Sequence, residues 1–191
     1  MTSITIFGHG NMGTAIAGVL TSGGASVERL DNRDVVGRIT GDIVVLAVPY
    51  HALQDIVDKY ADQLVGKIVV DITNPLNFET FDSLVVPVGS SAAAELAAAL
   101  PTSRVLKAFN TTFAATLGAK VVGPNQTTVL IAGDDTDAKA TLSAAITAGG
   151  LGAIDAGALS RAHELEAIGF LQLTLAAGEK IGWTGGFGIV R

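Results

Sequence analysis

The stretch SITIFGHGNMG, residues 3–13, decides the fold. The short β-branched run 3–7 predicts a strand, and the glycines that follow match the pattern G-x-G-x-x-G. That pattern is weak alone, but here it directly follows a predicted strand and opens a predicted helix over 11–22. Gly8 permits the tight turn, Gly10 lets a pyrophosphate approach the backbone, and Gly13 lets helix and strand pack closely. We therefore interpret the stretch as a dinucleotide-binding turn, in preference to a glycine turn of purely structural use.

Strand and helix patterns alternate from this turn onward. Further strands are expected at 25–30, 43–48, 67–72, 105–109, 128–132 and 153–156. Helices are expected at 50–64, 90–100, 134–148 and 158–181, with a loop at 76–89. This alternation predicts an α/β protein with a Rossmann-type, doubly wound parallel sheet and a small C-terminal helical extension. Residues 1–157 would form the dinucleotide-binding domain, and 158–191 a helix and tail that are not an independent domain.

Composition narrows the class of protein. Hydrophobic residues make up 49% of the 191 residues and charged residues 16%, so the chain can bury a core and does not resemble a disordered protein. A net charge of −6 argues against binding to nucleic acid or to an anionic membrane. The sequence has no cysteine, which excludes disulfides and thiolate metal sites, and we expect no metal. Neither a signal peptide nor a long apolar span is evident, so we expect a cytoplasmic protein.

The residues after the second predicted strand bear on the choice of dinucleotide. Asp31 stands where an acid would bind the ribose 2′-OH of NAD, whereas Asn32 and Arg33 stand where the 2′-phosphate of NADP would lie. We favour NADP because a guanidinium matches a phosphate in shape and charge. NAD remains the alternative.

The other predicted site residues lie in the glycine turn and after the third, fourth and fifth predicted strands, at the edge where open α/β sheets bind ligands. Asn74 and Asn110 would orient the nicotinamide carboxamide or a substrate carbonyl, or else serve as turn or cap residues. His9 is expected to be a spacer near the pyrophosphate, and no catalytic residue is assigned. The complete predicted cofactor site is Gly8, His9, Gly10, Asn11, Met12, Gly13, Asn32, Arg33, Ala47, Val48, Pro49, Asn74, Pro75 and Asn110.

Several of these motifs together resemble a known family. They are the glycine turn, Ala47-Val48-Pro49, the run Asp71-Ile72-Thr73-Asn74-Pro75, the run Lys107-Ala108-Phe109-Asn110 and Ala132-Gly133-Asp134-Asp135. The sequence resembles the NADPH-dependent deazaflavin (coenzyme F-420) reductases over nearly its whole length, and its fold is similar to the cytoplasmic reductase domain of ferric reductases. The resemblance implies NADP at the glycine turn, Asn32 and Arg33 on the 2′-phosphate, and a C-terminal helical part that builds the substrate cleft and a dimer contact. One departure is that 34–41 is too short for the usual helix.

The function predicted from these observations is an NADP-dependent oxidoreductase. It would transfer a hydride between NADPH and a small-molecule redox acceptor, such as a flavin, a deazaflavin or a ferric chelate. Two alternatives remain: an NADP(H)-binding sensor without turnover, and a small imine or hydroxyacid reductase. We also expect a homodimer, because the helix at 158–181 is apolar over most of its circumference.

Overall fold

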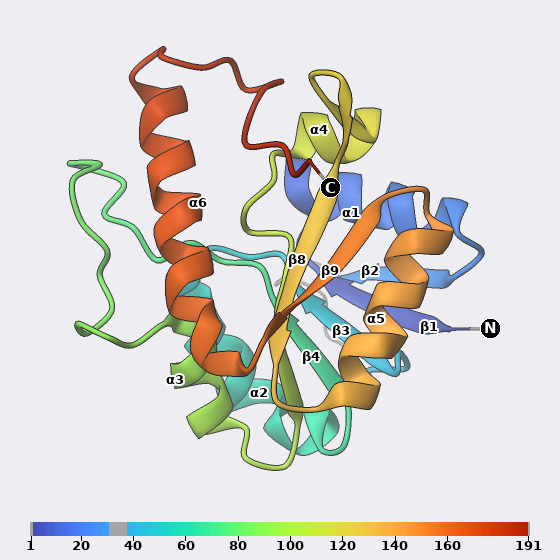
Figure 1. The fold of residues 1–191 in the computed structure, drawn as a ribbon. Coiled ribbons are helices and arrows are strands. Elements are labelled where there is room, and N and C mark those ends of the chain that lie inside the picture. The colour runs from blue at the N-terminus through green and yellow to red at the C-terminus, as the bar shows by residue number, and fades with distance from the viewer. Residues whose placement is uncertain (1, 31–37, 191) are drawn as a thin grey trace.

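The computed structural model describes residues 2–30 and 38–190 and contains one seven-stranded sheet (Figure 1). Its strands, in the spatial order β2-β1-β3-β4-β5-β8-β9, are β1 (Ser3–Phe7), β2 (Ser26–Leu30), β3 (Ile43–Leu46), β4 (Ile68–Asp71), β5 (Arg104–Lys107), β8 (Thr128–Gly133) and β9 (Gly152–Gly157). The helices are α1 (Asn11–Ser22), α2 (Leu53–Leu64), α3 (Ala92–Ala99), α4 (Ala114–Ala119), α5 (Thr136–Ala148) and α6 (Ala162–Ala177).

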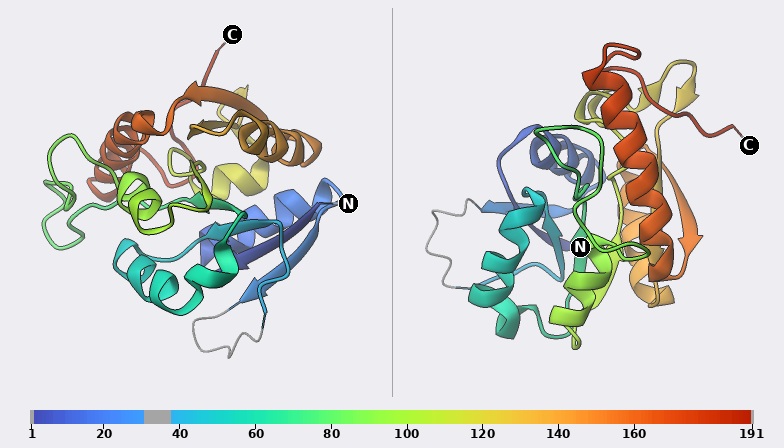
Figure 2. Two further views of the ribbon diagram at one scale, coloured as in Figure 1. Left: turned by 90° about the horizontal axis from the view of Figure 1, so that it is seen from below. Right: turned by 90° about the vertical axis from the view of Figure 1, so that its left-hand side faces the viewer.

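Helices cover both faces of the sheet, because its central strands are apolar on both sides. Ile43 and Val45 of β3 point into one core with residues of α1 and α5. The alternate residues Val44 and Leu46 point into a second core with residues of α2 and α3. Figure 2 shows the two helix layers on opposite sides of the sheet. This arrangement confirms the predicted fold class.

The order of the first three strands creates a crevice at one edge of the sheet. β1 pairs in parallel with β2 on one side and with β3 on the other. Helices α1 and α2 therefore leave the carboxyl ends of adjacent strands and pass to opposite faces. Such a reversal of strand order is where open α/β sheets bind ligands.

The sheet is mostly parallel, and it departs from the fully parallel prediction at one pair. β5 and β8 run antiparallel, while β8 and β9 are parallel to each other. The connection from β5 to β8 contains only α4 and a small hairpin of β6 (Val121–Val122) and β7 (Asn125–Gln126). This connection contains no helix that runs back along the sheet. β8 therefore starts at the end of the sheet where β5 finishes, and it runs antiparallel to β5.

Element boundaries differ in a few further places. The sequence did not predict α4 or the β6–β7 hairpin, nor the short 3-10 helices Tyr50–Ala52 and Leu159–Arg161. The last helix, expected at 158–181, ends at Ala177 because Gly178 caps it. No helix of the described residues is long and apolar enough to cross a membrane.

Candidate dinucleotide-binding site

The glycine turn sits tightly between β1, β3 and α1. Gly8 has a φ of 118°, and a Cβ there would strike the carbonyl oxygen of Ala47. A Cβ on Gly13 would lie 2.5 Å from the carbonyl oxygen of Gly8. Both glycines are therefore required by the fold itself, as the sequence pattern predicts for the turn and for close helix–strand packing.

Gly10 differs from these two glycines. A Cβ built on Gly10 meets no atom within 4 Å, and its φ of −66° suits any residue. Gly10 is also the N-cap of α1, which has no side-chain cap. The first-turn N–H groups of a helix carry partial positive charge and suit an anion. The space above Gly10 is therefore the part of the turn that a phosphate group could occupy.

A cavity of about 320 Å³ opens beside the turn. Phe7 and Tyr60, whose ring centroids are 5.3 Å apart, form part of its apolar wall. Its lining brings together six of the predicted site residues, Gly8, His9, Gly10, Ala47, Val48 and Pro49, with Phe7, Ala52, Asp55, Ile56, Lys59 and Tyr60, which the sequence did not single out.

The other predicted residues near the turn are placed differently. Asn11 is exposed on the first turn of α1, and Met12 is half-buried against the core beneath α1. Asn32 and Arg33, with the neighbouring Asp31, lie outside the residues that the structure describes. The predicted choice between NADP and NAD at that loop therefore stays a prediction.

Asn74 and Asn110, predicted to face the cofactor, bind each other. The Nδ2 of Asn74 donates to the Asn110 carbonyl oxygen at 2.9 Å, and the Nδ2 of Asn110 donates to Asn74 Oδ1 at 2.9 Å. Asn110 also donates to the carbonyl oxygen of Leu165 on α6 at 2.8 Å. Neither asparagine lines the cavity at the glycine turn, and Pro75 is buried beside them. The pair ties the ends of β4 and β5 to α6, and Asn74 as a residue is half-buried.

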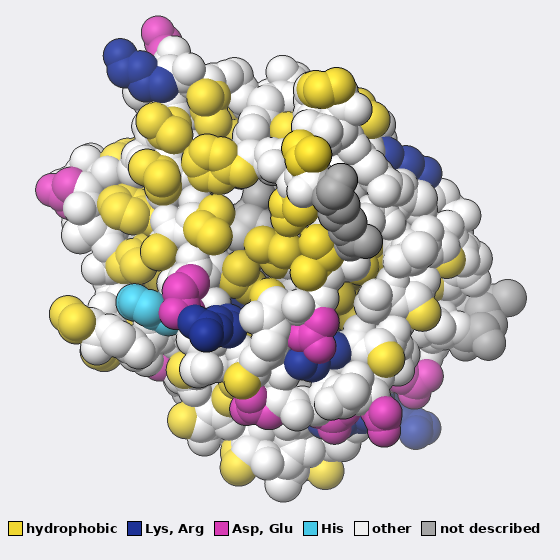
Figure 3. Space-filling model, in the orientation of Figure 1, with side chains coloured by type: hydrophobic (Ala, Val, Ile, Leu, Met, Phe, Trp, Pro, Cys, Tyr) yellow, Lys and Arg dark blue, Asp and Glu magenta, His cyan; other side chains and the backbone are white. Residues whose placement is uncertain are grey.

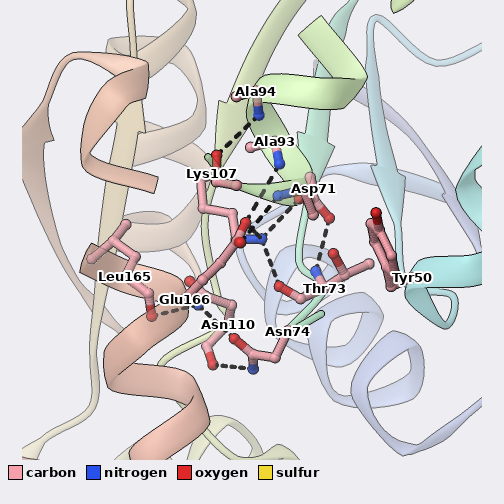
Figure 4. A network of polar contacts seen from close by, with 12 residues as sticks. Tyr50, Asp71, Thr73, Asn74, Ala93, Ala94, Lys107, Asn110, Leu165 and Glu166 are labelled. Carbon is pink, nitrogen blue, oxygen red and sulfur yellow. Dashed lines mark hydrogen bonds and ion pairs between the residues drawn. The ribbon is translucent and has the colours of Figure 1, made fainter. Parts of the chain in front are cut away.

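A buried ion network lies next to this pair (Figure 4). The Lys107 ammonium is 2.8 Å from Asp71 Oδ2 and 2.7 Å from Glu166 Oε1, and all three side chains are completely buried. Lys107 also donates to the carbonyl oxygen of Thr73 at 2.5 Å. Charges buried this deeply are tolerated because each finds a partner. The network therefore joins β4, β5 and α6 at one point.

Glu166 also closes the N-terminus of α3. Its Oε2 accepts a hydrogen bond from the Ala92 N–H at 3.0 Å, and its Oε1 accepts a longer one from Ala93 at 3.4 Å. The Ser91 side chain accepts from the Ala94 N–H at 3.0 Å. Burial raises the pKa of the Glu166 carboxyl, and the ammonium of Lys107 opposes that rise. We call Asp71, Lys107 and Glu166, with the Asn74–Asn110 pair, the polar lock.

Sequence reasoning missed the ion network of the polar lock, although a signal was present. Asp71 ends the otherwise apolar β4, Lys107 ends β5 directly after Val105 and Leu106, and the two charged residues are direct partners in the register of these strands. Residues of opposite charge at the last positions of two adjacent buried strands indicate an ion pair. Glu166 carried no such signal, because its contacts come from a helix 59 residues further along the chain.

The histidines and a tyrosine complete the polar groups near this edge. His51 is exposed, and His163 approaches the carbonyl oxygen of Ser90 at 3.0 Å through Nδ1. Tyr50 donates a hydrogen bond to Glu95 at 2.5 Å, and burial together with this carboxylate raises the pKa of Tyr50 to about 12. Among the described residues no group of three or more His, Cys, Asp or Glu side chains could hold a metal ion.

Comparison with known proteins agrees with this geometry. The fold and the glycine turn define a Rossmann-type α/β protein. A family model described as NADP oxidoreductase, coenzyme F420-dependent, matches residues 22–75. The F420-dependent NADP reductase of Methanocaldococcus jannaschii is 32% identical over 148 residues, which are 75% of this chain and 65% of that protein. These matches confirm the resemblance to the coenzyme F420-dependent NADP oxidoreductase family.

Two other similar proteins extend the comparison. The metalloreductase STEAP3 of Rattus norvegicus is 42% identical over 108 residues, 56% of this chain. The crystal structure of a putative F420-dependent NADP reductase from Arthrobacter sp. FB24 covers 100% of both chains with a TM-score of 0.84 at 23% identity, a likeness of fold. The chain spans only 21% of the rat protein and 65% of the archaeal one.

Proposed function

We propose that this protein is an NADP-dependent oxidoreductase that passes a hydride between NADPH and a small-molecule redox acceptor. The observation that carries the proposal is the open N-terminus of α1 at Gly10, set beside an apolar cavity at the reversal of strand order. The names of its relatives, an F420-dependent NADP reductase and a metalloreductase, support a nicotinamide cofactor and a redox acceptor.

In this proposal the predicted site residues contact different parts of the cofactor. The first turn of α1, from Asn11 to Gly13, would hold the pyrophosphate through backbone N–H groups, Gly8 would form the tight turn, and Gly10 would leave room for the pyrophosphate. Val48 and Pro49 would form an apolar wall against the ribose and ring. The amide of the half-buried Asn74 would meet the nicotinamide end, and buried Asn110 would hold it in place. Asn32 and Arg33 would bind the 2′-phosphate.

NADP, when bound, supplies the hydride carrier, and the protein supplies position. Hydride transfer to another redox ring depends on alignment more than on an acid–base group. The absence of an assigned catalytic acid in the predicted site is consistent with an acceptor such as a flavin or a deazaflavin, whose ring takes the hydride directly. A ferric chelate takes one electron at a time, so its reduction would pass through a reduced flavin that delivers the two electrons singly to two ferric ions. We place this reaction in the cytoplasm.

The test is NADPH oxidation measured against a panel of flavins, deazaflavins, quinones, ferric chelates and cyclic imines. Turnover with a redox ring, or with a ferric chelate when a flavin is supplied, supports the proposal. Tight NADPH binding with no turnover on any member would instead favour a sensor, and turnover confined to imines would favour a small imine reductase.

We also propose that two copies associate through α6. Ile168 and Leu171 on this helix are 37% and 51% exposed, and Trp183 and Phe187 of the following tail are also exposed. Figure 3 shows hydrophobic side chains gathered over α6. A contiguous exposed apolar surface is typical of an interface. Sedimentation at micromolar concentration should give a dimer, and a stable monomer there would contradict this assembly.

A further inference from the structure

One face of α2 is turned toward the cavity beside the glycine turn. Ala52, Asp55, Ile56 and Lys59 follow one another at helical spacing, and all four line the cavity. Asp55 and Lys59 lie one turn apart on the exposed rim. Lys59 is the one cation among the described residues that line this cavity, in a chain whose net charge is −6. Its position therefore singles it out for an anionic group of a ligand.

The cavity lies on the β1 and β3 side of the crevice, because its described lining comes from the ends of these two strands and from the region of α2, with no residue of β4 or β5. β1 also pairs directly with β2, whose last residue is Leu30. In Rossmann-type sheets the adenosine ribose lies near the end of the second strand. The other side of the crevice, at the ends of β4 and β5, is joined to α6 through Asn110 and Glu166. The cavity therefore suits the adenosine half of a dinucleotide, with its aromatic pair Phe7 and Tyr60 beside the base.

We propose that Lys59 binds the 2′-phosphate of the adenosine ribose and so contributes to the preference for NADP over NAD. This inference rests on the proposed function, and the residue that it adds to the site lies on α2. A lysine ammonium on a flexible stem is a good partner for a phosphate at the rim of a cavity. Asp55, one turn earlier, also lines the cavity, and its carboxylate would accept a hydrogen bond from a ribose hydroxyl.

The test compares four ligands: NADPH, NADH, 2′,5′-ADP and 5′-ADP. Their dissociation constants are measured by calorimetry on the parent protein and on Lys59→Met, Lys59→Arg and the control Lys180→Met. Lys180 is exposed after the end of α6 and does not line the cavity. Loss of a charged hydrogen bond should weaken NADPH and 2′,5′-ADP about ten-fold in Lys59→Met. NADH, 5′-ADP and the control should be unchanged, and Lys59→Arg should restore most of the loss.

Other results would overturn the inference in identifiable ways. Equal weakening of NADH and NADPH would place Lys59 on the pyrophosphate or in the wall of the cavity, and no change in any ligand would remove it from binding. In both cases the proposed function stands, provided that the parent protein binds NADPH and Gly10→Val does not. A parent protein that binds none of the four ligands overturns the proposed function and this inference together.

Discussion

Two helix N-termini lie at the same edge of the sheet, and they differ in whether side chains of the protein cap them. The N-terminus of α1 begins at Gly10 without a side-chain cap, and the space above Gly10 is open. The N-terminus of α3 is capped by Ser91 and receives the carboxylate of Glu166 from α6. Both ends carry the partial positive charge of a helix N-terminus.

The difference between these ends separates binding from architecture. At α3 the protein supplies its own anion, and Lys107 neutralises part of the buried negative charge. At α1 the described residues supply no anion, so an external phosphate group is the natural partner. The polar lock fixes α6 against β4 and β5, whereas the glycine turn keeps its surface free. Changes in the polar lock should therefore affect stability, and changes at Gly10 should affect ligand binding.

The largest expected effect comes from Lys107→Met. It leaves the carboxylates of Asp71 and Glu166 buried without their cation, which should lower the free energy of unfolding by about 3–5 kcal/mol. Urea unfolding monitored by circular dichroism measures this change, with exposed Lys180→Met as the control. A loss below about 1 kcal/mol would show that the polar lock does not hold α6 to the sheet.

A pair of glycine variants tests the two ends of the turn. Gly8→Ala should destabilise the protein by about 1–3 kcal/mol from backbone strain alone, and the clash with the Ala47 carbonyl adds to this. Gly10→Ala meets no atom and should change stability by less than about 0.5 kcal/mol. Thermal unfolding of the two variants gives both values, and equal losses would contradict the division between a structural and a ligand-facing glycine.

Gly169 tests the closeness of α6 to the polar lock. A Cβ there would strike the side-chain oxygen of Asn74, which Asn110 holds in place, so Gly169→Ala should cost about 1–3 kcal/mol. Gly18→Ala, at an exposed site within α1 with no neighbour in reach, should instead stabilise by up to about 1 kcal/mol. Denaturant unfolding compares the two, and a gain in stability from Gly169→Ala would mean that α6 lies further from β4.

The smallest expected effect on stability concerns Tyr50, and this effect depends on pH. Burial raises the pKa of Tyr50 and the hydrogen bond to Glu95 adds to the rise, so the folded environment of Tyr50 favours the protonated phenol. The contribution is present below the ordinary pKa of 10.0 and is lost as the pH rises through about 12. Ultraviolet titration follows the ionisation of the phenol, and Tyr50→Phe should remove the absorbance change near pH 12. An absorbance change near pH 12 that persists in Tyr50→Phe would contradict this pairing.

Much of the fold could be predicted from local patterns. Continuous apolar runs such as 43–48 indicate strands buried on both faces, and the glycine turn indicates where the crevice opens. The antiparallel entry of β8 could not be predicted, because it depends on a connection without a crossing helix. The pairing of Asn74 with Asn110 depends on how the chain turns after β4 and β5, and the pairing of Lys107 with Glu166 depends on where α6 packs, so neither could be predicted from local patterns.

The most direct test of the central claim is NADPH binding to Gly10→Val, measured by calorimetry alongside a check of folding by circular dichroism. A Cβ at this position meets no atom within 4 Å, and the methyl groups of valine would fill the space that a pyrophosphate needs. We expect a folded protein of near-parent stability that no longer binds NADPH. A folded Gly10→Val protein that binds NADPH as tightly as the parent would contradict the assignment of the open N-terminus of α1 as the phosphate site.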